Sequence, residues 1–210
     1  FPGAFGQINT RSLWMMLIVD VLLVGLAVWL KVIFKRYPGR LQVVWESLIS
    51  FFDGLVQETL GPKLRFYLPF ILTIFLFVWF SNLIGVFPHA SEPTRDLNFP
   101  LGLGLVVIAV VHVSSIKYKG IKAYLKDYAE PIIFLAPINI VGELAKGVSL
   151  SFRLFGNILG GAIIILVISE LVKYFVLPVG LFGFFGIFVG TIQAFVFTML
   201  SLTYIAVAIK

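Results

Sequence analysis

Long apolar runs separated by short polar segments make up most of the chain, and they predict membrane-spanning helices. A helix crosses the ~30 Å hydrocarbon core of a bilayer in about 20 residues. Three runs have about this length, 13–34, 66–87 and 99–116, and we predict an ordinary transmembrane helix for each. The first run is too long for the apolar region of a signal peptide, so we expect a transmembrane helix there and not a cleaved leader.

Two later apolar runs, 131–169 and 178–209, are longer than a bilayer is thick. As unbroken helices they would measure roughly 57 and 48 Å, so we expect both to tilt steeply or to break. Residues 41–60 place apolar and acidic positions at helical spacing, which favours an amphipathic helix at the membrane interface. The pattern predicts an all-α integral membrane protein, one membrane domain over 1–210 with about five spans and one interfacial helix.

Composition and charge agree with this class. Of the 210 residues, 60% are hydrophobic and only 12% are charged. The 16 lysines and arginines outnumber the 10 acidic residues, but they cluster in short segments between apolar runs. That distribution indicates membrane orientation and argues against nucleic-acid binding. The chain has no cysteine, which excludes disulfides and thiolate chemistry within it.

The basic clusters predict which connections face the inside. One cluster follows the first run and the other follows 99–116, and together they contain Lys31, Lys35, Arg36, Arg40, Lys117, Lys119, Lys122 and Lys126. The loop "PHASEPTRDLN" has only Arg95. Because positive residues collect on the inner side, we expect both clusters inside and the amino terminus and this loop outside.

Six polar side chains interrupt the run 131–169. They follow one another at steps of four, three, three, four and four residues and fall on one side of a helix: Asn139, Glu143, Lys146, Ser149, Arg153 and Asn157. This side cannot face lipid, because one arginine at a helix centre costs about 2.5 to 3.5 kcal/mol on insertion scales. For Glu143 and Lys146 two interpretations stay open, an ion pair at i, i+3 or a supporting role in an ion path.

Arg153 is the hardest of these residues to explain as a packing feature. No acidic residue lies one turn from it, and its guanidinium group cannot be deprotonated. We therefore expect its partner on another chain. On the last run, Gln193 has an amide that needs partners if it is buried, and Arg153 or Asn157 could supply them.

The segments "ELAKGVSLSFRLFGNILGG", "GTIQAFVFTMLSLTYIA" and "PTRDLN" closely resemble subunit a of the F-type ATP synthase, and the resemblance covers essentially the whole chain. It implies a membrane stator component whose last two helices form a hairpin against a rotating ring of c subunits. Arg153 matches the family's essential arginine, which separates two half-channels and meets each passing ring carboxylate. Asn157 and Gln193 match the polar positions beside it.

The same resemblance implies the partners and the location. These are the c ring, the peripheral-stalk b subunits, the remainder of the synthase, membrane lipid and a transported H⁺ or Na⁺, with no nucleic acid. ATP chemistry belongs to other subunits, so the chain is not an enzyme by itself. The implied location is the bacterial plasma membrane, with an organelle inner membrane or a thylakoid membrane as the alternative.

Two positions depart from the family pattern. Many proton-translocating relatives have a carboxylate or histidine nine residues after the arginine and a complementary His or Glu seven residues before the glutamine. Ala162 and Gly186 stand there in this chain. Three explanations remain for the outer half-channel: water alone conducts, Glu170 and Lys173 substitute, or the coupling ion is Na⁺. Family frequency favours H⁺.

Rival functions lack sequence support. An independent ion-coupled transporter, the alternative function, would favour inverted repeats with paired broken helices, and no such symmetry is visible. An intramembrane enzyme needs a nucleophile with a base, or a ligand set such as H-E-x-x-H. Two histidines do not make a metal site, and no G-x-x-x-x-G-K-[ST] motif occurs. We therefore expect no cofactor on this chain.

Overall fold

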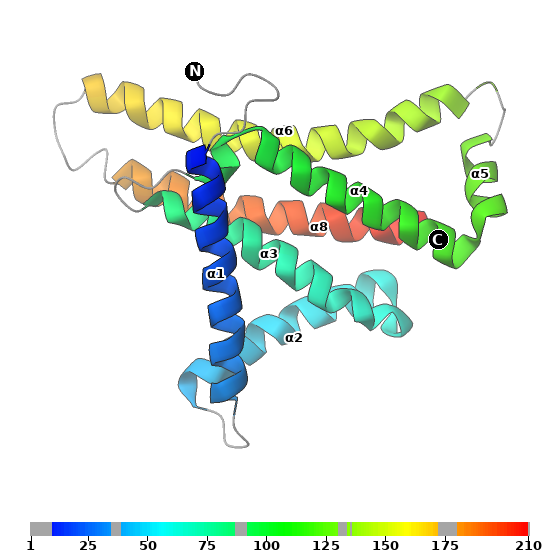
Figure 1. Cartoon of the computed structure of the whole chain (residues 1–210), viewed down its shortest axis with the longest axis horizontal. Coiled ribbons are helices and arrows are strands. Elements are labelled where there is room, and N and C mark those ends of the chain that lie inside the picture. Colours follow the sequence, from blue (N-terminus) through cyan, green and yellow to red (C-terminus); the bar gives the residue numbers. More distant parts are fainter. Residues whose placement is uncertain are drawn as a thin grey trace.

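The computed structural model of the chain describes residues 10–34, 39–86, 92–129, 134, 136–171 and 180–209. These residues form helices joined by short turns and contain no strand (Figure 1). Five of the helical segments are long and apolar enough to cross a membrane. The prediction of an all-α membrane protein with about five spans is confirmed.

The described elements follow one another in a simple order. The α-helices are α1 (Thr10–Ile33), α2 (Arg40–Leu60), α3 (Leu68–Leu83), α4 (Asn98–Lys119), α5 (Ile121–Ala129), α6 (Ala136–Leu171) and α8 (Gly190–Ile209). The short turns are the 3-10 segments η1 (Pro62–Tyr67), η2 (Ile84–Val86) and η3 (Pro93–Arg95), and the π-helical segment η5 (Gly183–Val189).

Helix ends differ from the predicted ones by a few residues, for local reasons. The second span begins at Pro62, because proline at the first helical position loses no backbone hydrogen bond. The third span continues to Lys119 and ends at Gly120, whose φ of 82° is a conformation that favours glycine. The predicted end of the second span, Phe87, lies outside the described residues.

The short helix α5 was not predicted, since the sequence indicated only a polar connection there. It packs against α4 and α6. Lys119 donates to Asp127 across the turn at Gly120, with 2.6 Å between Nζ and Oδ2. This ion pair ties the last turn of α5 back to the end of α4.

The helix α2 is not among the candidate spans, so its location at the membrane interface stays a prediction. Its apolar side chains Phe52 and Val56 are fully buried, and the rings of Phe52 and Phe75 lie 4.7 Å apart between centroids. Arg65 binds Asp53 through two hydrogen bonds of 2.7 Å. These bonds hold the pKa of Asp53 below its usual range, and they tie η1 back onto α2.

Helices α3, α4 and α8 form the apolar core, with α6 packed along α4. Small residues bring α4 and α6 together: a Cβ added to Gly104 would lie 2.3 Å from Ser151 Oγ and 3.1 Å from the Gly147 carbonyl oxygen. The Ser151 hydroxyl lies 2.9 Å from the Pro100 carbonyl oxygen and 2.8 Å from that of Gly147. This close approach fixes which side of α6 is turned inward.

The two runs that are longer than a bilayer is thick, 131–169 and 178–209, differ in their helical structure. The helix α6 is continuous over 36 residues, about 54 Å, so only a steep tilt would keep most of it within a bilayer. The last run changes from the π-helical η5 to the α-helical α8 at Gly190. Figure 1 shows α6 and α8 running alongside each other, across the direction of α1, and the two helices are in contact.

Candidate functional site

Arg153 projects from the side of α6 that faces away from α4. The inward side carries the buried residues Leu150, Ser151 and Leu154, whereas Arg153 is exposed beside the exposed Phe152. Arg153 makes no hydrogen bond or ion pair with any residue that the structure describes. Within the part of the chain that the structure describes, this permanent cation therefore has no counter-ion.

The residues that share this open side with Arg153 are small. Ser149 lies one turn before it and is exposed. A Cβ added to Gly156 or Gly160, which follow it, would meet no atom within 4 Å. Small side chains let a second helix approach the backbone closely, so this side leaves room for a helix next to the guanidinium group.

Asn157 and Gln193 meet across α6 and α8. The Asn157 side-chain amide donates to Gln193 Oε1 at 2.6 Å, so Asn157, one of the two partners the sequence suggested for Gln193, is the one in contact. Gln193 is only 3% exposed, and its Nε2 atom has no partner among the described residues. Since a buried donor without an acceptor costs about 1 to 3 kcal/mol, this N–H is available for a water molecule or another chain.

A second polar cluster joins α3, η3 and α8, and the sequence analysis missed it. Thr94 donates to Asn82 Oδ1 at 3.0 Å, and Asn82 Nδ2 donates to the Gly190 carbonyl oxygen at 2.9 Å. Both side chains are completely buried. Gly190 allows the contact, because its added Cβ would lie 3.0 Å from Asn82 Cβ. The signal available in the sequence was the polar pair "SN" near the end of an apolar run.

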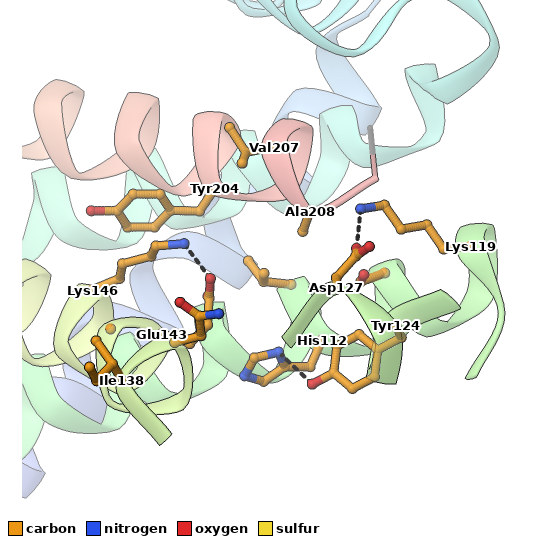
Figure 2. A pocket seen from close by; sticks show the side chains of 14 residues that line it. His112, Lys119, Tyr124, Asp127, Ile138, Glu143, Lys146, Tyr204, Val207 and Ala208 are labelled. Carbon is orange, nitrogen blue, oxygen red and sulfur yellow. Dashed lines mark hydrogen bonds and ion pairs between the residues drawn. The ribbon is translucent and has the colours of Figure 1, made fainter. Parts of the chain in front are cut away.

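A cavity of about 640 Å³ opens at the other end of the bundle, between α4, α5, α6 and α8. Three residues of the predicted polar side line it: Asn139, Glu143 and Lys146. Figure 2 shows the Glu143 and Lys146 side chains joined in an ion pair, so the paired interpretation of these two residues is correct. The pair nevertheless borders a cavity, so it does not exclude a place beside an ion path.

The opposite wall of the cavity comes from α4 and α5. The Tyr124 hydroxyl lies 3.2 Å from His112 Nδ1, and the ion pair of Lys119 with Asp127 lies nearby (Figure 2). His112 is therefore a hydrogen-bonded residue of a helix contact. Among the described residues no group of three or more His, Cys, Asp or Glu side chains can hold a metal ion.

The remaining predicted residues lie apart from these clusters. Glu170 is exposed near the end of α6, and Lys173 lies outside the described residues. Beside the departing position Ala162, a Cβ added to Gly161 would lie 2.8 Å from Phe185 Cδ1. The helix α6 and the segment η5 are therefore close together beside Ala162.

The fold and these clusters define a multi-pass membrane protein with buried polar groups and a fixed cation on an open helix face. The family model described as ATP synthase A chain matches residues 12–206. The chain is 37% identical over 199 residues to the ATP synthase subunit a of Acidothermus cellulolyticus, covering 91% of this chain and 73% of the relative. It is 40% identical over 197 residues to subunit a 1 of Syntrophotalea carbinolica, covering 92% and 83%. The chain belongs to the ATP synthase A chain family.

Family membership confirms the resemblance that the sequence motifs carried. The protein is a multi-pass membrane component of the F-type ATP synthase, and it acts in ion translocation within the Fo stator. It is not a catalytic subunit of that complex.

Proposed function

We propose that Arg153 is the fixed charge that separates two half-channels and meets each carboxylate of a rotating c ring. The observation that carries this proposal is the exposed guanidinium group on the open side of α6, which has no partner among the described residues. The small residues beside it leave space for a ring helix. The hairpin of α6 and α8 then lies against the ring.

The charge of Arg153 accounts for both parts of this role. A cation in a low-dielectric seam favours the ionised form of a nearby carboxyl group, so it promotes release of the ion that a ring carboxylate carries. It also repels a bare cation that would otherwise cross directly. Such leakage is costly, because each elementary charge carries about 2.3 kcal/mol per 100 mV of membrane potential.

Two polar regions are candidates for the half-channels. The cavity with Asn139, Glu143 and Lys146 supports an inner one, because basic residues of the inner connections border it. The cluster of Asn82 and Thr94 supports an outer half-channel at the opposite end of the helix bundle. Between them stands the pair of Asn157 and Gln193, which we assign to orienting Arg153. Ser149, Glu170 and Lys173 remain supporting candidates.

The proposed partners are the c ring, the peripheral-stalk b subunits and membrane lipid. The proposed location is a bacterial plasma membrane, since the relatives named above are bacterial proteins. The coupling ion is H⁺ in this proposal, with Na⁺ as the alternative.

ATP-driven transport by the whole synthase tests the proposed function. In inverted vesicles, ATP hydrolysis should acidify the lumen at the same rate with and without Na⁺, and a protonophore should abolish the gradient. Sodium-dependent turnover that persists with the protonophore would show that Na⁺ is the coupling ion.

The orientation can be measured because the chain has no cysteine. A single cysteine replacing the exposed Lys122 should react with an impermeant thiol reagent only from the inside, since basic connections stay inside. The matched variant Arg95→Cys should react only from the outside. Labelling in the reverse sense would invert the proposed topology.

Gln193→Leu should lower ATP-driven pumping several-fold without preventing assembly. The substitution removes the acceptor of the Asn157 amide, a bond worth about 1 kcal/mol, and a water molecule can replace part of it. Pumping rates in vesicles, normalised to co-purified complex, provide the measurement. Ile192→Leu, at the exposed neighbouring position, is the control and should pump normally. Unchanged rates in Gln193→Leu would reduce the residue to a packing role.

A further inference from the structure

The acidic residue Glu92, just before η3, lies directly against η2, the short turn that follows α3. A Cβ added to Gly85 would lie 2.1 Å from Glu92 Cγ and 2.2 Å from Oε1. The carboxyl group thus fills the space that any side chain at position 85 would occupy. Glu92 is half-buried, and the two residues that follow it, Pro93 and Thr94, are buried.

This carboxyl group lies on the face that carries the outer polar cluster. Gly85 follows Asn82 by three residues, a step that places both on one side of the helical end. Thr94, two residues after Glu92, donates to Asn82, which in turn donates to the Gly190 carbonyl oxygen. Gln193 lies almost one turn further along α8, and its oxygen accepts from Asn157.

The same region also borders η5 and, through it, α6. The turn η2, which contains Gly85, is in contact with η5, which contains Gly186. The segment η5 in turn contacts α6, where Ala162 lies. Glu92 therefore supplies a carboxyl group near a region in which Ala162 and Gly186 have no titratable side chain.

Two other described acidic residues lie at this end of the molecule, Asp96 and Glu170, and both are less suited to exchanging a proton with the polar cluster. Asp96 is engaged locally, since its Oδ1 accepts from the backbone and the side-chain amide of Asn98 at 3.1 and 3.0 Å. Glu170 is exposed and lies 17 residues beyond Arg153, about 25 Å along α6. Glu92 alone among them combines partial burial with contact to Gly85, three residues after Asn82 of the polar cluster.

We propose that Glu92 takes up H⁺ from the outer surface and passes it to the path along Asn82 and Gln193, in a region where Ala162 and Gly186 offer no titratable side chain. This inference rests on the proposed function of Arg153 and the outer half-channel. The carboxylate accepts a proton from outer water and returns it to water deeper in the path, so it ends each transfer unchanged.

The surroundings of Glu92 favour this exchange. Burial raises the pKa of its carboxyl group, and the nearby Arg95 opposes that effect, so the group holds a proton more readily than a solvated glutamate. The helix α3 has no charged residue. The other helices packed against η3 carry these described charged residues: Asp20, Lys31, Lys117, Lys119, Glu143, Lys146, Arg153 and Glu170.

The decisive experiment restores the carboxylate chemically in the cysteine-free chain. Glu92→Cys in the whole synthase should lower ATP-driven H⁺ pumping about tenfold or more. Treatment from the outside with 2-carboxyethyl methanethiosulfonate, which returns a carboxylate, should recover most of the rate. Methyl methanethiosulfonate, which adds a neutral group, should not. Mass spectrometry of the subunit confirms each modification.

Matched variants separate the alternatives. Leu171→Cys, at an exposed position near the same end of α6, should pump normally before and after either reagent. Glu92→Gln keeps the side-chain shape and should assemble but pump as poorly as Glu92→Cys. Normal pumping by Glu92→Gln, loss of assembly in it, equal recovery with both reagents, or no reaction at position 92 would each overturn the proposal. Normal pumping by Arg153→Ala would instead overturn the proposed function, so the two failures are distinguishable.

Discussion

Replacing Arg153 by alanine should abolish ATP synthesis and ATP-driven pumping, while the synthase still assembles. The Arg153 side chain is exposed on α6 and forms no bond within the described part of the chain, so its removal leaves the contacts of α6 with α4 intact. Without the charge, a ring carboxylate is no longer held in its ionised form at the interface, and the barrier between the half-channels falls. Passive ion leakage should rise in the same vesicles.

Arg153→Lys should also fail substantially, although it keeps a positive charge. An ammonium group is more strongly hydrated, lacks the planar fork of guanidinium and can lose its proton when it is buried. Val148→Ala, at an exposed position of the same helix, is the matched control and should pump normally.

The measurement first confirms assembly by co-purification and then follows pumping in inverted vesicles. Near-normal pumping by Arg153→Ala would remove this residue from the mechanism and leave it a structural role.

Gly104→Val should prevent stable assembly of the chain, reducing the amount found in membranes several-fold. The added Cβ would lie 2.3 Å from Ser151 Oγ and 3.1 Å from the Gly147 carbonyl oxygen, which is backbone and cannot rotate away. Helices α4 and α6 must therefore separate, and overpacking of this kind costs typically about 1 to 3 kcal/mol. The hydroxyl contact of Ser151 with the Pro100 carbonyl oxygen would be lost as well.

Gly102→Val is the matched control, because it changes the same residue type on the same helix. A Cβ at Gly102 meets no atom within 4 Å, and the position is exposed. Immunoblots of membranes and of the purified complex compare the two variants. Equal amounts of both variants would show that the packing of α4 against α6 does not depend on this contact.

Local pattern was sufficient to predict the helices. Hydrophobic length and helical periodicity depend on neighbouring residues only, so the five spans could be located to within a few residues, and the polar side of 136–171 could be recognised. The short helix α5 was missed because its nine residues are too few and too polar to stand out from a charged connection. Motifs of the family were likewise local, and they identified Arg153, Asn157 and Gln193.

Periodicity could not show which residues on the polar side of α6 line a cavity and which stay exposed. Asn139, Glu143 and Lys146 turn into a cavity, whereas Arg153, on the same side, remains open. The difference arises because α5 and the end of α8 cover only the first part of α6. Which neighbour covers a given turn depends on the path of the whole chain, and no spacing within α6 contains that information.

The sequence by itself thus determined the membrane class, the helices and the absence of an acidic residue one turn from Arg153, because hydration, charge and helical spacing act locally along the chain. Only the tertiary structure decided the contacts of Asn82 with Thr94 and Gly190, and of Glu92 with Gly85. The bond between Asn82 and Gly190 joins residues 108 positions apart. Such contacts depend on how closely helices approach, and that approach is set by the shapes of small residues on several helices at once.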